Sequence, residues 1–466
     1  MQSIANVTRS GKDRSSGKAL WIGGAGRGSR AKRTYPVVRC HVASVNRPLR
    51  IALLSYRSKP HSGGQGVYVR HLSRELAALG HRVEVFSGQP YPELDPGPVL
   101  REVPSLDLYR EDDPFRTPRP GEIRDWADVL ETVMMWAGAF PEPLTFSIRA
   151  LRELRARAGD FDVVHDNQGL GYGMLGVPKL GLPLVTSVHH PITVDKRLDL
   201  EGLGWWRRMS KSRWYGFLRM QGRVARRCGP LITVSESSKR DICMDFRVLR
   251  ENVHIVPLGV DTRRFRPRDG RALRVPGRIV AVASSDHPLK GLPTLLRAIA
   301  KIVTERDVHL VVVGPPSDST RQLAVQLSIA DRVTFTSGLS DDEYAALLAS
   351  AETAVVASMY EGFSLPAVEH MASGTPLIAT QAGALPEVTG DAALPVAAGD
   401  PEELAAALRR MHDSPALRER LSRKGLDRVR QRFAWPAVAA ATARLYRDVI
   451  KPDTASADRI NGDTAC

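Results

Sequence analysis

The sequence lacks the long apolar runs that membrane-spanning helices require. None of its apolar stretches approaches the ~18 consecutive residues that cross a bilayer as a helix. The basic N-terminal segment has no long apolar core either, because the stretch from Ala19 to Ala25 is short and interrupted by glycines. This pattern argues against a secretory signal. The sequence therefore predicts a cytoplasmic protein without transmembrane helices.

Cysteine is scarce, and its placement excludes the common cysteine-based sites. The four cysteines are scattered and form no C-x-x-C pair. Unpaired thiols in a reducing compartment are expected, without disulfides or a cysteine-bound metal. No Asp-x-Asp loop follows a predicted strand, and Asp112-Asp113 lies in a proline-rich segment. We therefore predict that the protein needs neither a metal nor another cofactor.

Acidic residues are nearly absent from the first 47 positions, which carry ten Lys or Arg and one Asp. This segment holds a charge of +9 and leaves +6 of the total +15 for the rest of the chain. It is rich in Gly and Ser without apolar periodicity, which is typical of a disordered extension. Since most of the excess charge belongs to this extension, we predict no nucleic-acid partner.

From Arg50 onward, short apolar runs alternate with amphipathic segments, which is the pattern of parallel sheets with crossover helices. The length exceeds one ordinary domain, so we expect an α/β protein of two Rossmann-like domains that face each other across a cleft. Residues 261–277 combine proline, glycine and charge and indicate the linker. The predicted parts are a basic extension at 1–48, an N-terminal domain at 49–262, a C-terminal domain at 263–433, a helix at 434–450 and a tail at 451–466.

Strands are predicted where apolar runs are bounded by turn residues. In the N-terminal domain they lie at 50–56, 81–87, 162–165, 184–188, 231–234 and 253–257, and in the C-terminal domain at 278–283, 309–313, 333–336, 354–357 and 377–380. Ligands of such sheets bind at the carboxyl ends of the strands. The chemistry is therefore expected in the loops that follow the strands.

Two glutamates eight residues apart, Glu361 and Glu369, give the strongest functional signal. Ser364 is a plausible N-cap, which places Glu361 in a loop and Glu369 on the following helix. Free backbone N–H groups from Phe363 to Leu365 then form a site for an anion such as a diphosphate. A carboxylate there can accept paired hydrogen bonds from the vicinal hydroxyls of a sugar. Taken alone, the two glutamates would more often be a capping residue and a surface residue.

The stretch around these glutamates resembles the E-x7-E motif of glycosyltransferase family 4, a family of retaining enzymes with the GT-B fold. The resemblance covers about residues 49–450. Further segments occur in the family's order and spacing: LITVSE at 231–236, IVPLGVD at 255–261, HLVVVG at 309–314, VTFTSGL at 333–339, DDEYAALL at 341–348 and GTPLIATQAGALPE at 374–387.

The resemblance implies donor-binding roles for the matching positions. Glu361 would contact hydroxyls of the donor sugar, and Glu369 would bind the ribose of the nucleotide. Gly63 and Gly64 match the family's Gly-Gly turn, where the backbone approaches the diphosphate closely, although a plain tight turn is the alternative. The other implied donor contacts are the amides near Gly362, Phe363, Ser364 and Leu365 for the phosphates, and Gly338 and Leu339 beside the base.

The catalytic residues that the resemblance implies are His189, Lys290 and Glu361. LVTSVHH at 184–190 matches a strand whose family counterpart ends in an active-site histidine, and the spacing favours His189 over His190. Lys290 matches a phosphate-binding lysine. The arginine that usually precedes it is replaced by Ser284 or Ser285. A serine hydroxyl can still donate one hydrogen bond, so Ser284 is kept among the donor-binding residues, but the planar cation with several donors is lost. Compensation by another cation, different donor binding and loss of catalysis all remain open, and we favour compensation because the loop length is kept.

These features predict a retaining glycosyltransferase that moves a hexosyl group from a nucleoside-diphosphate sugar to a hydroxyl acceptor. Same-face substitution needs stabilisation of the leaving diphosphate and positioning more than a protein nucleophile. The alternatives are a nucleotide-sugar epimerase or hydrolase of the same fold and a non-catalytic sugar-nucleotide-binding protein. A nicotinamide-dependent dehydrogenase fits poorly, because Gly63-Gly64-Gln65-Gly66 is not G-x-G-x-x-G.

A basic segment at 202–235 suggests where the acceptor is found. It contains eight cations and no acid, and as one helix it would gather Trp214 and apolar residues on one face and Arg219, Arg223 and Arg227 on the other. Such segments adsorb to anionic membranes. One hypothesis is therefore a peripheral enzyme on the cytoplasmic membrane face with a lipid-linked acceptor. The alternative is that the apolar face packs on the sheet of the N-terminal domain.

Overall fold

The structure is a computed structural model that describes residues 47–58, 64–110, 112–189, 192–200, 202, 204–268, 274–283 and 288–450. The described residues from 48 to 450 group into one compact unit. The predicted extension at 1–48 and the predicted tail at 451–466 therefore fall almost entirely outside the described residues. In the described ranges, every helix is too short or too polar to cross a membrane.

The first half of the described chain forms a sheet of seven parallel strands. Their order is β3-β2-β1-β4-β5-β6-β7, so the order reverses between β1 and β4. β1, β2 and β4 are buried along almost their whole length, as expected for a parallel sheet covered on both faces. The strands are β1 (Arg50–Ser55), β2 (Arg82–Ser87), β3 (Val99–Glu102), β4 (Val163–Asn167), β5 (Leu184–Ser187), β6 (Leu231–Thr233) and β7 (Val253–Ile255).

The second half of the described chain forms a sheet of six parallel strands in the order β10-β9-β8-β11-β12-β13. Here the order reverses between β8 and β11. The strands are β8 (Val275–Val282), β9 (His309–Val313), β10 (Val333–Thr336), β11 (Ala351–Val356), β12 (Leu377–Thr380) and β13 (Ala393–Val396).

The α/β fold class is confirmed, and every predicted strand is present within a few residues of its expected bounds. Two strands were not predicted. β3 is a mostly exposed edge strand with two charged residues, and β13 is an edge strand that contains Pro395, so neither has the apolar pattern of a buried strand. β8 begins at Val275, inside the predicted linker, and the predicted domain boundary at 262/263 lies between β7 and β8.

Helices connect the strands of both sheets. Those of the first half are α1 (Gly64–Ala78), α2 (Trp126–Trp136), α3 (Glu142–Ala156), α4 (Thr193–Leu200), α5 (Trp205–Trp214), α6 (Phe217–Ala225) and α7 (Glu236–Phe246). Those that follow are α8 (Leu292–Ile302), α9 (Asp318–Gln326), α10 (Asp341–Ser350), α11 (Leu365–Ala372), α12 (Leu385–Thr389), α13 (Pro401–Asp413), α14 (Pro415–Arg432) and α15 (Trp435–Ile450).

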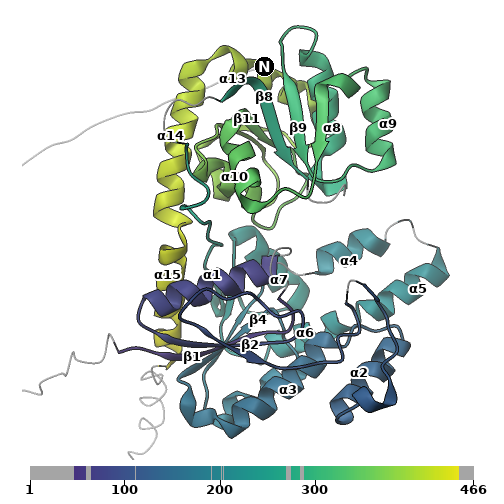
Figure 1. The fold of residues 1–466 in the computed structure, drawn as a ribbon, viewed down its shortest axis with the longest axis vertical. Coiled ribbons are helices and arrows are strands. Elements are labelled where there is room, and N and C mark those ends of the chain that lie inside the picture. The colour runs from purple at the N-terminus through teal and green to yellow at the C-terminus, as the bar shows by residue number, and fades with distance from the viewer. Residues whose placement is uncertain are drawn as a thin grey trace, which may run out of the picture. The chain divides into compact units, whose positions relative to one another are not determined.

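The C-terminal helix α15 returns to the first sheet and lies beside α1 (Figure 1). Trp435 and Tyr446 of α15 share a buried apolar cluster with Val69 and Leu72 of α1. The Tyr446 hydroxyl also contacts the buried ring of His165 in β4. The helix predicted at 434–450 is confirmed, and its packing joins the end of the chain to the core of the first half.

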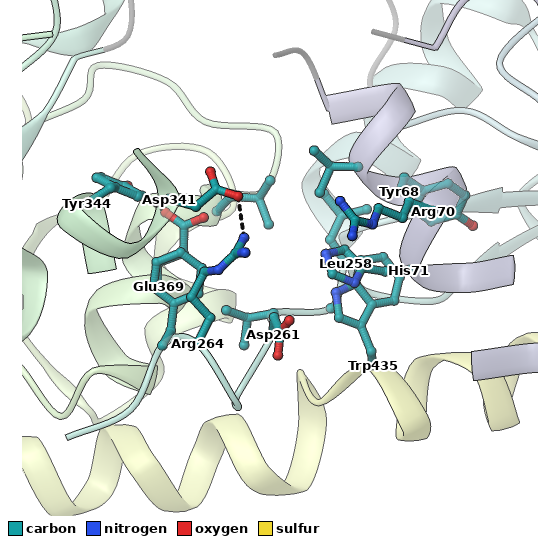
Figure 2. Close-up of a pocket in the computed structure, with 15 residues that line it drawn as sticks. Tyr68, Arg70, His71, Leu258, Asp261, Arg264, Asp341, Tyr344, Glu369 and Trp435 are labelled. Atoms are coloured by element: carbon teal, nitrogen blue, oxygen red, sulfur yellow. Dashed lines mark hydrogen bonds and ion pairs between the residues drawn. The ribbon is translucent and has the colours of Figure 1, made fainter. Parts of the chain in front are cut away.

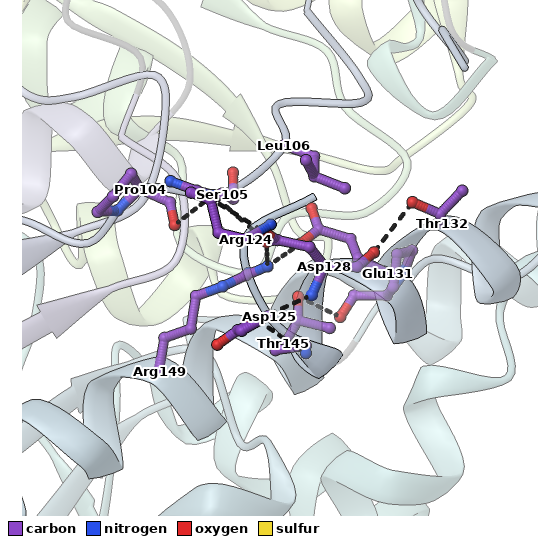
Figure 3. A network of polar contacts seen from close by, with 12 residues as sticks. Pro104, Ser105, Leu106, Arg124, Asp125, Asp128, Glu131, Thr132, Thr145 and Arg149 are labelled. Atoms are coloured by element: carbon purple, nitrogen blue, oxygen red, sulfur yellow. Dashed lines mark hydrogen bonds and ion pairs between the residues drawn. The ribbon is translucent and has the colours of Figure 1, made fainter. Parts of the chain in front are cut away.

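Helices α2 and α3 are joined by buried ion pairs (Figure 3). Arg149 of α3 donates from Nη2 to Asp128 Oδ1 at 2.5 Å and to Glu131 Oε2 at 2.6 Å, both on α2. Arg124 binds Asp128 from the other side at 3.1 Å. Removing one partner of such a network leaves an uncompensated buried charge at a cost of about 3–5 kcal/mol. The network therefore fixes α2 on α3.

The segment predicted as one membrane-docking helix is two helices, because α5 ends at Trp214 and α6 begins at Phe217. The Trp214 ring packs against Tyr109 and Phe140, with centroid distances of 5.4 and 5.1 Å. Val224 of α6 belongs to the apolar core beside the first sheet. The predicted docking face is therefore wrong, because its apolar side chains pack inside the protein. Its cations Arg219, Arg223 and Arg227 are exposed.

Candidate active site

Lys290 and Glu361 meet because they follow neighbouring strands. Lys290 comes after β8 and Glu361 after β11, and these strands pair at the point where the strand order reverses. Lys290 Nζ donates to Glu361 Oε1 at 3.0 Å, and the Ser358 hydroxyl donates to the same oxygen at 2.7 Å. The Lys290 and Glu361 side chains are 25% and 11% exposed, so both remain accessible to a ligand.

Two glycines allow the loops around this pair to pack closely. Gly291 has a left-handed φ of 65°, and a Cβ there would lie 1.9 Å from the Ala357 carbonyl oxygen. Gly383 is also left-handed, and its Cβ would lie 2.3 Å from the Glu361 carbonyl oxygen. Any side chain at these positions would therefore move Lys290 or the Glu361 loop.

The backbone in front of α11 is strained at Ser364. This residue occupies the predicted N-cap position, but its φ is 80° and its side chain makes no capping bond, so the predicted cap is wrong in that respect. Such conformations cost about 1–3 kcal/mol in a non-glycine residue and occur mainly at functional sites. The Ser364 hydroxyl is buried without a hydrogen-bond partner in the described part of the chain. Together with the first amides of α11, it offers hydrogen-bond donors to an anion.

Glu369 lines a cavity of ≈ 270 Å³. Tyr344 and Glu369 lie on one wall of the cavity, and Tyr68, His71 and Trp435 lie on the opposite wall (Figure 2). The Tyr344 hydroxyl donates to Glu369 Oε2 at 2.7 Å. Burial raises the pKa of the Glu369 carboxyl to about 7, against the hydrogen bond from Tyr344, which lowers it. A carboxyl of this kind in a walled cavity suits a pair of vicinal hydroxyls.

The same cavity is bordered by the segment that joins the two sheets. Arg264 from this segment forms an ion pair with Asp341 at the start of α10 (Figure 2). His71 stacks on Trp435 with a centroid distance of 5.2 Å, and burial lowers the pKa of His71 to about 4, so its ring is neutral at pH 7. The cavity therefore has a cation, carboxylates and aromatic surface within reach of one ligand.

His189 lies at the carboxyl edge of the first sheet, just after β5. Its Nε2 lies 2.8 Å from Asn167 Oδ1, at the end of the neighbouring strand β4. Since an amide oxygen only accepts hydrogen bonds, Nε2 carries a proton. The Tyr68 ring packs edge-on against the imidazole at a centroid distance of 4.5 Å. Asn167 and Tyr68 together fix the orientation of the ring.

The other predicted site residues lie in several places, and some fall outside the described residues. Gly362 and Phe363 belong to the loop before α11, while Gly338 and Leu339 lie in the loop between β10 and α10, at the carboxyl end of β10. Gly64 is the first residue of α1, so the helix begins earlier than the predicted Gly-Gly turn allows. Gly63 and Ser284 lie outside the described residues, as do His190 and Ser285.

Comparison with known proteins identifies the family. Residues 62–264 match the profile described as Glycosyltransferase Family 4, and residues 276–414 match the profile described as Glycosyl transferases group 1. Over 408 residues, the chain is 57% identical to the "MMP alpha-(1->4)-mannosyltransferase" of Mycolicibacterium hassiacum, which spans 86% of this chain and 98% of that protein. The chain belongs to glycosyltransferase family 4. It is therefore a glycosyltransferase, as the E-x7-E resemblance implied.

More distant relatives of this glycosyltransferase agree with that assignment. It is 30% identical over 457 residues to the "D-inositol 3-phosphate glycosyltransferase" of Streptomyces avermitilis, covering 90% of this chain and 91% of that protein. Among solved structures, it is similar to sucrose-phosphate synthase from Thermosynechococcus elongatus, with a TM-score of 0.62, 25% identity and coverage of 86% and 99% of the two chains. The lipopolysaccharide glycosyltransferase WaaG has a TM-score of 0.60 at 18% identity, with coverage of 85% and 99%, and shares the fold. The fold is thus GT-B.

The sequence alone did not indicate the supporting residues Tyr344, Asn167 and Ser358. Tyr344 lies within DDEYAALL, a segment that matched the family without an assigned role. Asn167 ends β4, the neighbour of the strand that precedes His189, and Ser358 lies just after the end of β11 and before Glu361. The signal that could have located Asn167 and Ser358 is their position at or just after the carboxyl ends of β4 and β11, strands that flank a reversal of strand order. Tyr344 lies within α10 and has no such signal.

Proposed function

We propose that this enzyme transfers a mannosyl group from a nucleoside-diphosphate mannose to a sugar hydroxyl and forms an α-(1→4) bond. The supporting observation is the 57% identity to an α-(1→4)-mannosyltransferase over nearly the whole length of that protein. The relatives whose names specify inositol phosphate are about 30% identical. Mannosyl transfer to the acceptor abbreviated MMP is therefore favoured over transfer to inositol phosphate.

In this proposal, the donor diphosphate lies between Lys290 and the first turn of α11. The Lys290 ammonium lies beside the Glu361 loop, and the α11 amides with the buried Ser364 hydroxyl can donate to phosphate oxygens. These groups stabilise the negative charge that develops on the leaving diphosphate. No divalent ion is needed for that step, because the protein's own donors meet the charge.

Glu361 is proposed to bind hydroxyls of the donor sugar. Its Oε1 already accepts from Lys290 and Ser358, which holds the carboxylate in one orientation. Glu369 is proposed to bind the ribose in the cavity shared with Tyr344. Glu361 would then bind the sugar end of the donor and Glu369 the ribose end. Together they would place the anomeric carbon near the first sheet.

Transfer is proposed to retain the anomeric configuration. A nucleoside-diphosphate mannose is α-linked, so an α-linked product requires the acceptor oxygen to attack from the side on which the diphosphate leaves. The C1–O bond to the diphosphate breaks, the acceptor oxygen bonds to C1, and the departing phosphate oxygen can take the acceptor proton. His189, held by Asn167 and Tyr68, is proposed to position the reacting sugar through hydrogen bonds.

A direct test is to incubate the full-length protein with UDP-, GDP- and ADP-mannose and candidate acceptors, and to analyse the products by NMR. We expect one nucleotide to support transfer and the new linkage to be α-(1→4). A β-linked product would contradict the retaining mechanism. Free mannose or an epimerised donor as the sole product, with acceptor present, would favour the hydrolase or epimerase alternative. Donor binding without any turnover would favour the non-catalytic alternative.

A further inference from the structure

The first turn of α7 is held by a carboxylate from the other half of the chain. Glu387, in α12, accepts from the backbone N–H of Glu236 at 2.8 Å and from that of Ser237 at 2.9 Å. These two amides belong to the first turn of a helix, where no intrahelical partner is available and a negative charge is favoured. Glu387 thus binds the first half through charge-assisted hydrogen bonds.

The same turn of α7 also holds the loop that carries Glu361. The Gly362 carbonyl oxygen accepts from the Ser235 hydroxyl at 2.6 Å and from the Ser238 hydroxyl at 3.0 Å. Ser235 and Ser238 are at most 1% exposed. Hydrogen bonds protected from water in this way are stronger than exposed ones.

The Glu361–Gly362 segment is therefore held from two sides. From the second half of the chain, to which Glu361 itself belongs, the Ala384 N–H donates to the Glu361 carbonyl oxygen at 2.8 Å. From the first half, the hydroxyls of Ser235 and Ser238 donate to the next carbonyl oxygen, that of Gly362. Val234 and Phe363 lie in one buried apolar cluster beside these bonds. Contact with α7 therefore adds a second point of attachment to the backbone that directly follows the Glu361 side chain.

We infer that Ser235, Ser238 and Glu387 form a latch that couples contact between the two halves of the enzyme to the orientation of Glu361. The three are positioning residues, since they act on Glu361 through its backbone and on α7 through its amides. This inference rests on the proposed role of Glu361 as a ligand of the donor sugar. It assigns a role to two segments, LITVSE and GALPE, whose function the sequence left open.

The latch makes a specific kinetic prediction. The side chains proposed to bind the nucleotide, Lys290, Ser364 and Glu369, all lie in the second half, and the first half supplies only the opposite wall of the cavity. We therefore expect turnover to depend on the latch much more than nucleotide affinity does. We expect E387Q, which replaces one accepting oxygen by an NH2 group facing an N–H donor, to lower kcat at least tenfold. S238A removes one bond to Gly362 and leaves the Ser235 cap of α7 in place, so we expect a smaller loss, about three- to tenfold.

The experiment measures kcat and donor KM for transfer, the nucleotide Kd by calorimetry and the melting temperature of the full-length variants. The matched control is E403Q, because Glu403 also accepts from a backbone N–H, that of Ala397, but within the second half alone. We expect wild-type kcat for E403Q, and a nucleotide Kd within about twofold of wild type for all variants. X-ray scattering should show a larger radius of gyration for E387Q.

Two results would overturn the latch. One is a kcat for E387Q and S238A within twofold of wild type. The other is a parallel loss of nucleotide affinity and melting temperature, which would show a general structural role. The kcat and Kd of each variant are compared with those of the wild type on whichever nucleotide-sugar donor the wild-type enzyme uses. If that donor is not a mannose donor, the proposed function is refuted, but the same comparison still tests the latch.

Discussion

The proton on Glu369 should control how tightly the enzyme binds a ribonucleotide. The Glu369 carboxyl has a pKa of about 7, raised by burial. The ionised carboxylate can accept hydrogen bonds from both ribose hydroxyls, and the protonated acid is a poorer acceptor. Affinity should therefore rise as the pH passes upward through 7, and it should fall when the carboxyl is protonated.

The size of this effect follows from the pKa. If only the ionised form binds the ribose, about 90% of the enzyme is competent at pH 8 and about 10% at pH 6, so the Kd should change about tenfold. Y344F removes a hydrogen bond of 2.7 Å to the carboxylate. A bond to a charged group is worth about 1.5–3 kcal/mol, so the pKa should rise by about one to two units in this variant.

The assay is calorimetry with the cognate nucleotide sugar between pH 6 and pH 9. The diphosphate of a nucleotide sugar has no terminal group that titrates in this range, so the ligand does not mask the effect. In Y344F, the rise in affinity should shift to higher pH. A 2′-deoxy analogue of the donor should bind more weakly and with less pH dependence.

Two outcomes would refute this reasoning. If E369Q retained the same pH dependence as the wild type, another group would be responsible. If Y344F left the midpoint unchanged, the hydroxyl would not control the carboxyl, and Glu369 would not bind the ribose in the way proposed.

Four further predictions concern turnover, metal, the N-terminus and the membrane. E361A should retain nucleotide binding and lose at least tenfold in kcat, which calorimetry and rate assays together would check; a matching loss of affinity would contradict it. Transfer should continue in EDTA, and loss of activity that a divalent ion restores would show a metal requirement. Removal of residues 1–47 should leave the melting temperature and kcat unchanged, because the first strand begins at Arg50. Any binding of this truncated protein to anionic vesicles should fall when the exposed Trp205 and Trp206 become Ala.

The apolar pattern of the sequence determined most of the fold. Continuous apolar runs such as RIALLSY and HRVEVFS are long enough, and sufficiently bounded by turn residues, to predict buried parallel strands. The edge strands β3 and β13 escaped prediction, because an edge strand needs neither a continuous apolar run nor a full set of N–H donors.

The sequence also singled out residues that the structure brings together. Glu361, Glu369 and Lys290 were assigned from a resemblance, and the structure places Lys290 and Glu361 in contact because β8 and β11 pair. The environment of Glu369 could not be predicted, since its raised pKa arises from burial, and it lines a cavity whose other walls include α1 and Trp435.

Only the tertiary structure decided which surfaces are covered and which distant groups meet. The amphipathic pattern of α6 is equally compatible with a membrane and with a sheet, and Val224 shows that the sheet covers it. The latch joins Ser235 to Gly362 across 127 positions of sequence, and α15 reaches back to His165 across 281. The spacing of apolar residues shows that one face of a helix is apolar. It does not show what packs against that face or which distant group forms a hydrogen bond, because these contacts depend on how the two sheets and the last helix pack.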